Sequence, residues 1–193
     1  MNYLAQIFLS GNDSQLQVGN FIGDFVKGSN GKHYPKDIRK GIDLHRKIDY
    51  FTDNHELVRE TIVMMRPEFG RYSGIILDMY FDYFLASNFT VYSRKSLNLF
   101  AFRFYFSALI NYRHLPPRVK NFVFYFIFSN RLNKYAFING LQQSLEIMAT
   151  YKSKAIKPQK TIAYLIENKL ELERRFHLFF PDLITYVEME KQV

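Results

Sequence analysis

Residues 41–53, GIDLHRKIDYFTD, carry polar side chains whose types and spacing could do chemistry. His45, Asp49 and Asp53 follow one another at intervals of four, so an unbroken helix would place them on one face. Such a face can bind a divalent metal ion or a phosphate, but it is more often a solvent-exposed ion-pair cluster. Alone, this stretch favours the exposed cluster, and other segments must decide between the two.

A second segment places carboxylates where water is expected to be scarce. Between residues 74 and 86 the only charged side chains are Asp78 and Asp82, one helical turn apart among large apolar residues. An ionised carboxylate that is buried without a partner strongly destabilises the fold. We therefore expect a cation on this face: a metal ion, His45, or an arginine such as Arg46 or Arg71. The alternative is a helix with one solvent-exposed stripe.

A third segment, residues 16–28, repeats the pattern. Asn20 and Asp24 are four residues apart within an apolar stretch, and Gly19 and Gly23 would let a backbone or a ligand approach closely. The alternative interpretation is a helix cap on an exposed edge.

Helical bundles form metal sites from side chains that project inward from facing helices. The three segments together therefore predict an oxygen-rich site with one imidazole, of a kind that suits Mg²⁺ or Mn²⁺ acting on a phosphate ester. Its expected members are Asp24, His45, Asp49, Asp78 and Asp82.

The elements that must position these residues are expected to be helices. Apolar residues recur at three- and four-residue steps through residues 36–65, with Asp53 or Asn54 capping a new helix there. A long amphipathic helix is expected over residues 159–180, ending before Pro181. The aromatic-rich residues 97–129 could contain a buried strand, but the neighbouring helical period favours helix and an aromatic core. We predict an all-α, single-domain helical bundle over residues 1–193.

Composition and charge exclude several classes of protein. The chain is 48% hydrophobic and 18% aromatic, which excludes general disorder, and it has no cysteine for disulfides, zinc–thiolate sites or a thiol nucleophile. We find no signal peptide and no apolar run long enough for a membrane span, so a cytoplasmic location is expected. The net charge of +8 favours an acidic partner. No RNA-binding or helix-turn-helix signature favours nucleic acid.

Several collinear stretches resemble one family. MNYLAQIFLS, VGNFIGDFVKG, GIDLHRKIDYFTD and GRYSGIILDMYFDYFLA look like the acyl carrier protein phosphodiesterase (holo-ACP hydrolase) family, from Met1 to the region of Ser93. The resemblance implies an all-α domain related to the HD (histidine–aspartate) phosphohydrolases. It also implies Mn²⁺-dependent hydrolysis of the phosphodiester between 4′-phosphopantetheine and a serine of acyl carrier protein, within fatty acid biosynthesis.

Carried over by position, the resemblance implies a metal site and catalytic residues. The metal ligands would be Asp24, His45, Asp78 and Asp82, with Mg²⁺ as the alternative to Mn²⁺. The catalytic residues would be Asp24, His45, Arg46 and Asp49, where Arg46 neutralises phosphoryl charge and Asp49 orients a neighbour. Beyond the positions carried over, we expect Asn20, Lys27, Arg71 and Tyr72 to bind the substrate.

Two positions depart from the family pattern. Gln6 and Tyr83 stand where the family usually has histidines, so the alternatives are a catalytically weakened relative that binds carrier protein, or a phosphohydrolase acting on another phosphodiester or a nucleotide. An acidic carrier protein would need a basic docking surface, and the oligomeric state stays open. Candidate docking residues are Lys27, Lys32, Arg113, Arg118, Lys120, Lys152, Lys154, Lys157 and Lys160.

Overall fold

The regular structure of this protein is helical. The structure is a computed structural model that describes residues 1–151 and 153–192, except for the side chains of residues 29, 30, 32 and 192. Throughout these residues every regular element is a helix, so the expected all-α class is confirmed. The α-helices are α1 (Tyr3–Leu9), α2 (Ser14–Phe21), α3 (Lys36–Asn54), α4 (Glu56–Phe69), α5 (Ser73–Ser87), α6 (Phe89–Tyr92), α7 (Leu97–Ile110), α8 (Pro117–Phe128), α9 (Arg131–Lys134), α10 (Ile138–Tyr151), α11 (Pro158–Glu167) and α12 (Lys169–Gln192). Short 3₁₀ turns are η1 (Gly23–Phe25), η2 (Gly28–His33), η3 (Gly70–Tyr72) and η4 (Tyr112–His114).

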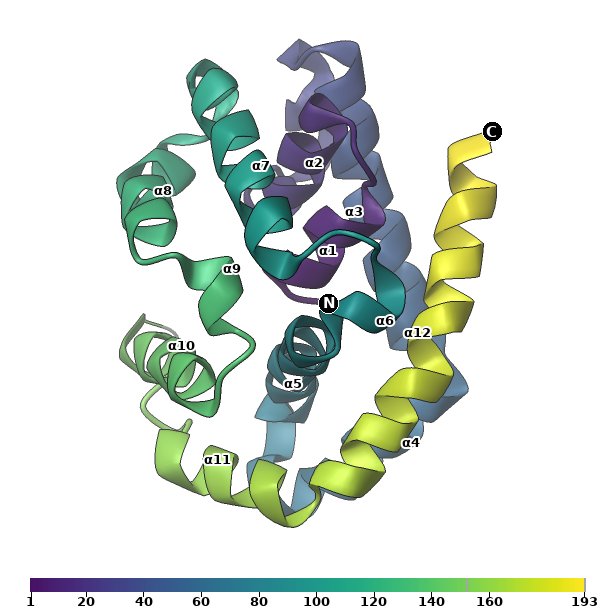
Figure 1. Cartoon of the computed structure of the whole chain (residues 1–193), viewed down its shortest axis with the longest axis vertical. Coiled ribbons are helices and arrows are strands. Elements are labelled where there is room, and N and C mark those ends of the chain that lie inside the picture. The colour runs from purple at the N-terminus through teal and green to yellow at the C-terminus, as the bar shows by residue number, and fades with distance from the viewer. Residues whose placement is uncertain (152, 193) are drawn as a thin grey trace.

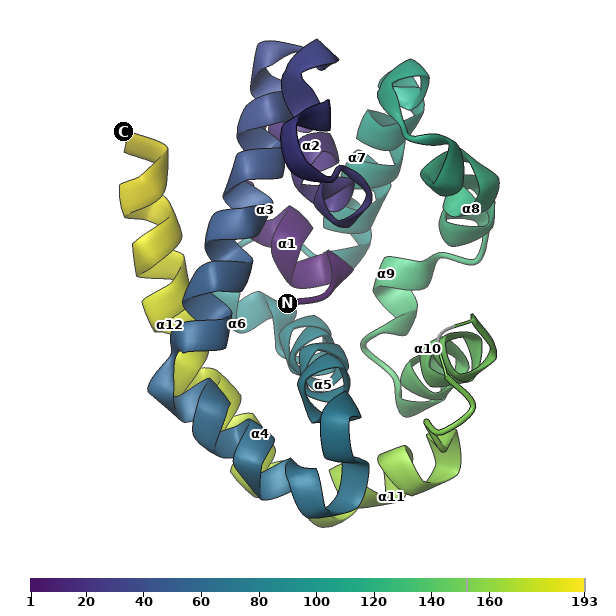
Figure 2. The same ribbon diagram turned by 180° about the vertical axis from the view of Figure 1, so that it is seen from behind.

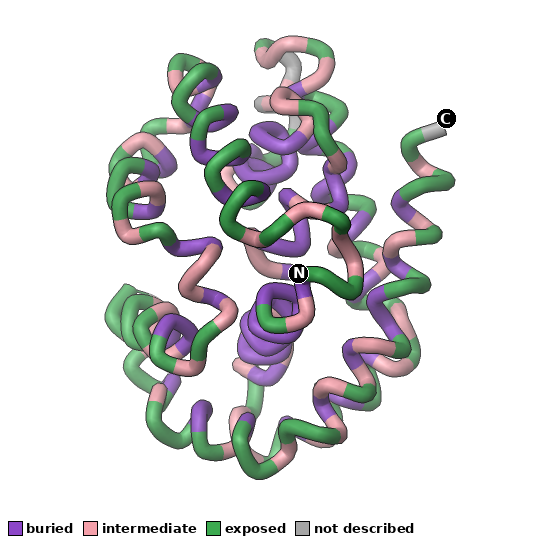
Figure 3. Tube along the Cα trace, in the orientation of Figure 1, coloured by how far each residue is buried: buried purple, intermediate pink, exposed green. Residues whose placement is uncertain are grey.

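Helix α5 is the centre of the bundle. Helices α3, α4 and α12 lie along one side of it and α8, α9 and α10 along the other, with α11 joining the two sides (Figures 1 and 2). Residues 79–86 of α5 are all buried, and Tyr80 and Phe84 have no exposed surface (Figure 3). A helix that is apolar on nearly all sides is stable only when other elements cover it completely. No helix within the described residues is both long and apolar enough to cross a membrane.

Helices α2 and α3 cross at very short range because each has a glycine at the crossing. A Cβ atom on Gly19 would lie 2.1 Å from the carbonyl oxygen of Ile38, and one on Gly41 would lie 2.3 Å from that of Leu16. The sequence prediction that Gly19 admits another backbone is therefore confirmed. This crossing sets α2 directly against the face of α3 that carries the polar residues of the opening motif.

Helix α1 is attached to α5 through Asp82. The Asp82 side chain is completely buried, and its two carboxylate oxygens accept hydrogen bonds from the backbone N–H groups of Leu4 (2.8 Å) and Ala5 (3.0 Å). The first N–H groups of a helix have no partner within the helix, so a carboxylate placed there satisfies them. Asp82 thus caps α1 from another helix.

The expected helix over residues 159–180 was wrong in its boundaries. The chain breaks at Asn168 between α11 and α12, and α12 continues through Pro181 to Gln192. Proline removes one helical hydrogen bond, but Phe180 and Leu183 on either side of it are fully buried. Packing of α12 against α3, α4 and α5 therefore outweighs the local cost of the proline.

Two other expectations need adjustment. Residues 97–129 are helical as predicted, but the aromatic residues are only partly core, because Phe104 is buried while Phe102 is 68% exposed. Helix α3 runs to Asn54, so His55 is the N-cap of α4 in place of Asp53 or Asn54. The continuous α3 confirms that residues 45, 49 and 53 share one helix.

Replacing Asp82 by asparagine tests its role as the anchor of α1. The amide would keep one acceptor but would turn an NH₂ group toward the second backbone N–H, so Asp82→Asn is expected to lower the free energy of unfolding by about 2–3 kcal/mol. Urea denaturation measures this loss. The control is Asp53→Asn, an exposed residue of α3, which is expected to change stability little. Equal stability of the two variants would contradict the anchor.

Candidate functional site

Three of the predicted residues come together in one cluster. Asp24, His45 and Asp49 each offer a ligand atom, and these atoms all lie within 4.8 Å of one another. His45 Nε2 is 3.2 Å from Asp49 Oδ2 and 3.4 Å from Asp24 Oδ1. The histidine is buried, Asp49 is half-buried and Asp24 is exposed, so the cluster opens to solvent on the side of Asp24.

Two local elements bring the cluster together. His45 and Asp49 lie one turn apart on α3, and the turn η1 after α2 carries Asp24 over them. Gly23 makes this possible, because a Cβ atom there would lie 2.3 Å from His45 Cγ. The imidazole ring therefore occupies the space that any other residue at position 23 would fill.

The orientation of the His45 ring is fixed by Asn20, which is completely buried. The Asn20 amide nitrogen donates to the Gln6 carbonyl oxygen (2.8 Å) and to Ser10 Oγ (2.9 Å), so its oxygen Oδ1 is left facing His45 Nδ1 at 3.2 Å. Nδ1 must then carry a hydrogen. In the neutral ring, the lone pair is consequently on Nε2, which faces the two carboxylates. Asn20 was expected to bind substrate, and the structure instead places it behind the histidine.

Gln6 is a member of the site that spacing did not reveal. Its side chain is buried, and Nε2 donates a 2.7 Å hydrogen bond to Asp49 Oδ1. Gln6 and Ser10 are four residues apart on one side of α1, and this was the available signal that a polar edge of α1 faces the site. At this position, where the family resemblance implies an imidazole, the chain has an amide that holds Asp49.

The carboxylates favour the protonated form of His45 when no metal competes. Burial of the ring opposes the charge, but the hydrogen bonds and charges of Asp24 and Asp49 outweigh it and raise the pKa of His45 to about 9. Burial acts to raise the pKa of Asp49, yet His45 and the Met1 ammonium group together lower it. The cluster is thus a strongly coupled set of one cation and two anions.

The same residues fit a divalent cation. His45 Nε2 is buried and has no well-aligned hydrogen-bond partner, although it faces two carboxylates. Ligand atoms of one metal ion lie about 3 Å apart when each is about 2.1 Å from the ion. One imidazole and two carboxylates suit Mn²⁺ or Mg²⁺ better than a thiolate-seeking metal. Asp24, His45 and Asp49 could therefore hold such an ion.

Asp78 and Asp82 lie outside this group of three, although both were expected to be ligands. A cation does lie beside Asp78, but it is the α-amino group of Met1 rather than His45 or an arginine; this group is 3.3 Å from Asp78 Oδ1 and 3.4 Å from Asp49 Oδ1. Burial acts against the charge of this amino group, but Asp78 and Asp49 raise its pKa to about 10.

The pKa of Asp82 is raised to about 7 because its carboxyl group is buried. The two hydrogen bonds that it accepts from backbone N–H groups act in the opposite direction. Asp82 is engaged with α1, as described above.

Arg46 and Lys27 flank the cluster at the surface. Arg46 Nη2 donates to the carbonyl oxygens of Val26 (3.2 Å) and Gly28 (3.1 Å), and so fastens the loop that follows Asp24 to α3. Both Arg46 and Lys27 are exposed. Arg46 thus contacts the loop that positions Asp24.

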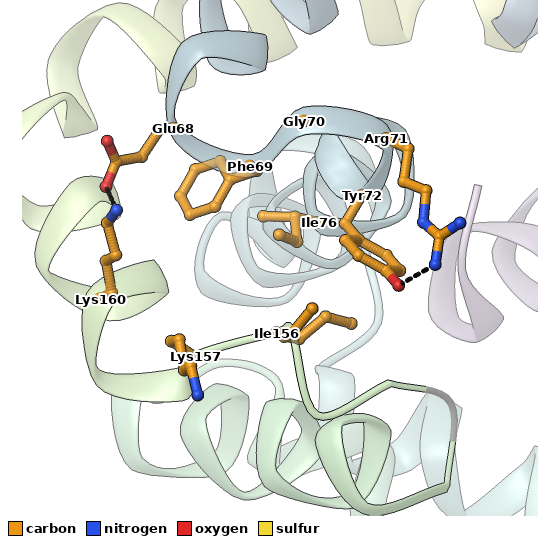
Figure 4. Close-up of a pocket in the computed structure, with 10 residues that line it drawn as sticks. Glu68, Phe69, Gly70, Arg71, Tyr72, Ile76, Ile156, Lys157 and Lys160 are labelled. Atoms are coloured by element: carbon orange, nitrogen blue, oxygen red, sulfur yellow. Dashed lines mark hydrogen bonds and ion pairs between the residues drawn. The ribbon is translucent and has the colours of Figure 1, made fainter.

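Arg71 and Tyr72, both expected to bind substrate, lie in a separate cavity of about 250 Å³ (Figure 4). The cavity lies between the end of α4 and the segment before α11, and Phe69, Ile156 and Lys157 are also in its lining. Arg71 Nη2 donates to the Tyr72 hydroxyl at 2.7 Å, and that hydroxyl donates to Ser153. No residue of the Asp24–His45–Asp49 cluster lines this cavity.

The remaining expected positions are scattered. Tyr83 is buried on α5 with its ring near Phe84, and it is not part of the metal-ligand group. Of the candidate docking residues near α11, Lys154, Lys157 and Lys160 are exposed, and Lys160 forms an ion pair with Glu68 (2.7 Å). Lys152 and the side chain of Lys32 lie outside the described residues.

Comparison with known proteins points to one family. The family model described as acyl carrier protein phosphodiesterase matches residues 1–183. Proteins named acyl carrier protein phosphodiesterase from Salmonella agona (strain SL483) and Salmonella newport (strain SL254) are each 31% identical to this chain, over 95% of the chain and 96% of the relative. No solved structure matches.

Gly23→Ala tests the contact between η1 and the imidazole. The added methyl group would force His45 or η1 to move, so we expect a loss of about 1–3 kcal/mol in stability and at least about tenfold weaker Mn²⁺ binding. Denaturation and calorimetric titration measure the two effects. The matched control is Gly74→Ala, whose Cβ would have only an ordinary contact at 3.8 Å. If Gly23→Ala behaves like the control, this role of Gly23 is wrong.

The raised pKa of His45 makes stability depend on pH. Because its pKa is about 9 in the folded protein against 6.5 for an ordinary histidine, the stabilisation is complete below pH 6.5 and is lost as pH rises through 9. In EDTA, the stability difference between wild type and His45→Gln should shrink by about 2 kcal/mol from pH 7 to pH 9.5. Urea denaturation at several pH values tests this, with His33→Gln, an exposed histidine, as control. A difference that is constant with pH would contradict the coupling.

Proposed function

The chain belongs to the acyl carrier protein phosphodiesterase family, and we propose that it hydrolyses the phosphodiester of holo-acyl carrier protein, releasing 4′-phosphopantetheine and apo-acyl carrier protein. The observation that supports this most is the Asp24–His45–Asp49 cluster, which opens to solvent beside exposed cations. Manganese, a role in fatty acid metabolism and a cytoplasmic location belong to the same proposal, because they follow from the family resemblance.

We propose that Asp24, His45 and Asp49 hold Mn²⁺ or Mg²⁺. Such an ion, when bound, supplies positive charge for the phosphoryl oxygens and makes water more acidic. The protein's own contribution is orientation: Asn20 keeps the Nε2 lone pair directed at the cluster, and Gln6 holds Asp49. Both are buried, so the cluster is preorganised before substrate arrives.

The surface cations have distinct proposed tasks. Arg46 is a positioning residue, because its hydrogen bonds to Val26 and Gly28 keep Asp24 over His45. Lys27, exposed on the same loop, is available to the phosphate or to acidic side chains of the carrier protein. Asp78 stays a proposed acidic residue of the site, beside Asp49. The proposed role of Asp82 is to anchor the start of α1. Arg71 and Tyr72 stay candidates for contact with the pantetheine arm in their own cavity.

One observation favours a second candidate function. At position 6 an amide replaces the imidazole usual in the family, and this amide is already hydrogen-bonded to Asp49. A protein with one ligand fewer could bind holo-acyl carrier protein without turning it over. A third possibility, another phosphodiester or a nucleotide as substrate, is separated from the first by a substrate panel.

The test is an assay of holo-acyl carrier protein with Mn²⁺, in which mass spectrometry follows loss of the phosphopantetheine arm. Wild type should release the arm, and Asp24→Asn should be slower by about 100-fold or more because a ligand carboxylate is lost. EDTA should abolish the reaction, and the exposed α3 variant Asp53→Asn should react like wild type. Carrier-protein binding with no release by wild type would favour the non-catalytic alternative. Release by Asp24→Asn at the wild-type rate would refute the cluster as the site.

A further inference from the structure

The net charge of the chain comes from one stretch. Residues 83–145 contain eight lysines and arginines and no aspartate or glutamate, while the other 18 cationic residues are balanced by all 18 acidic residues. Within the described residues, none of these eight cations forms an ion pair with a carboxylate. The stretch covers α6–α9 and part of α10, so the charge excess is confined to one part of the fold.

The same stretch exposes large apolar side chains. Helix α7 is apolar on both sides: Phe100 and Phe104 are buried, while side chains on the opposite side project into solvent. A helix that is apolar all round is ordinarily covered on every side, by protein or by lipid. We define the aromatic face as Phe102 (68% exposed), Phe106 (59%), Ile110 (63%), Phe124 (44%), Tyr125 (62%) and Phe128 (83%).

Ring contacts connect α8 to α7 and to the turn between them. Tyr105 of α7 packs against Phe126 of α8 with ring centres 6.1 Å apart, and Tyr112 of η4 packs against Phe124 at 5.4 Å. Phe124 in turn stacks on Phe128, one helical turn further along α8, at 6.4 Å. Helices α7 and α8 lie next to each other along one side of the molecule in both views (Figures 1 and 2). The exposed Arg103 lies beside Phe102 in the sequence, and Arg113 and Arg118 lie in or beside the connection between the helices. The ammonium nitrogen of Lys120 lies over the Tyr112 ring, 5.2 Å from the ring centre.

We propose that the aromatic face is a docking surface for an anionic lipid bilayer. Amphipathic helices that lie in a membrane interface combine Phe and Leu side chains, which enter the acyl region, with Lys and Arg at the headgroups. A two-fold contact with a second copy of the chain would bring the two positive stretches together without acidic partners, and this opposes self-association. The expected docking residues Arg113, Arg118 and Lys120 lie in α8 or the turn before it, beside the aromatic face, and so are assigned to lipid headgroups rather than to carrier protein.

The shape of the face also favours lipid over an acidic protein. Phe128 and Phe102 project far into solvent, being 83% and 68% exposed, so a protein partner would need a matching hollow for each of them. Fluid acyl chains accommodate such projections at any spacing. The cavity lined by Arg71 and Tyr72 is formed by other elements, at the end of α4 and before α11.

Vesicle flotation with the full chain tests this inference. We expect binding to vesicles of phosphatidylcholine mixed with phosphatidylglycerol, weaker binding in high salt, and little binding to phosphatidylcholine alone. The double variant Phe106→Ser/Phe128→Ser should bind at least about tenfold more weakly, because two inserted rings are lost. Its control is Tyr50→Ser/Leu170→Ser, two side chains that are 70% and 86% exposed on other helices. Circular dichroism checks that each variant is folded.

The charge requirement is tested separately with Arg103→Glu/Arg118→Glu, which should lose about tenfold or more in binding to anionic vesicles. Arg59→Glu/Lys154→Glu, exposed cations outside the stretch, should bind like wild type. The proposal is overturned if wild type fails to bind anionic vesicles or binds neutral ones equally well. It is also overturned if the aromatic-face variants weaken carrier-protein binding or dissolve a dimer while vesicle binding is unchanged. Because vesicle binding requires no turnover, its failure is distinct from failure of the hydrolase assignment.

Discussion

The site depends on the completely buried amide of Asn20. Asn20 joins three helices, because it lies on α2, donates to α1 at Gln6 and Ser10, and accepts from His45 on α3. A buried amide is stable only when its donors and acceptor are all matched, so each of these partners constrains the others. The matched arrangement permits one orientation of the amide and one tautomer of the neutral histidine. The chemistry of Nε2 is therefore decided several ångströms away, in the packing between helices.

The close crossing of α2 and α3 is what brings Asn20 within reach of His45. Gly19 and Gly41 let the helices approach, and Gly23 then leaves room for the ring. Asp82 fixes the start of α1 on α5, which in turn sets the position of Gln6 beside Asp49. Backbone proximity, polar matching and the carboxylate cluster are thus parts of one constraint. Loss of any part would displace the ligand atoms of the proposed metal site, which must converge within a few tenths of an ångström to hold an ion.

Much of this arrangement could be predicted from the sequence, and the remainder depends on contacts between helices. Helical spacing correctly placed His45 and Asp49 on one turn of α3, and the glycines of residues 16–28 correctly indicated a close approach. The same spacing could say that Asp82 lies in an apolar helix but could not name its partner. From the sequence, the expected partner was a cationic side chain or a metal ion, whereas the structure supplies backbone N–H groups of α1. Pro181 misled for a related reason, since tertiary packing outweighs a local helix-breaking preference.

Gln6 stands where the family resemblance implies an imidazole, and the exchange has two opposite effects. An imidazole at this position could supply a lone pair to a metal ion, whereas the Gln6 nitrogen Nε2 can only donate a hydrogen bond. Glutamine at this position lacks a nitrogen ligand for a metal ion, but it provides a hydrogen-bond donor to Asp49. Without this donor, the half-buried Asp49 carboxylate would be stabilised only by its charged neighbours. The Gln6 oxygen Oε1 is buried without a hydrogen-bond partner, which leaves one unsatisfied acceptor behind the cluster. A buried acceptor without a donor destabilises the folded state. This residue therefore keeps Asp49 oriented at the expense of stability, as expected where function rather than packing sets the choice of side chain.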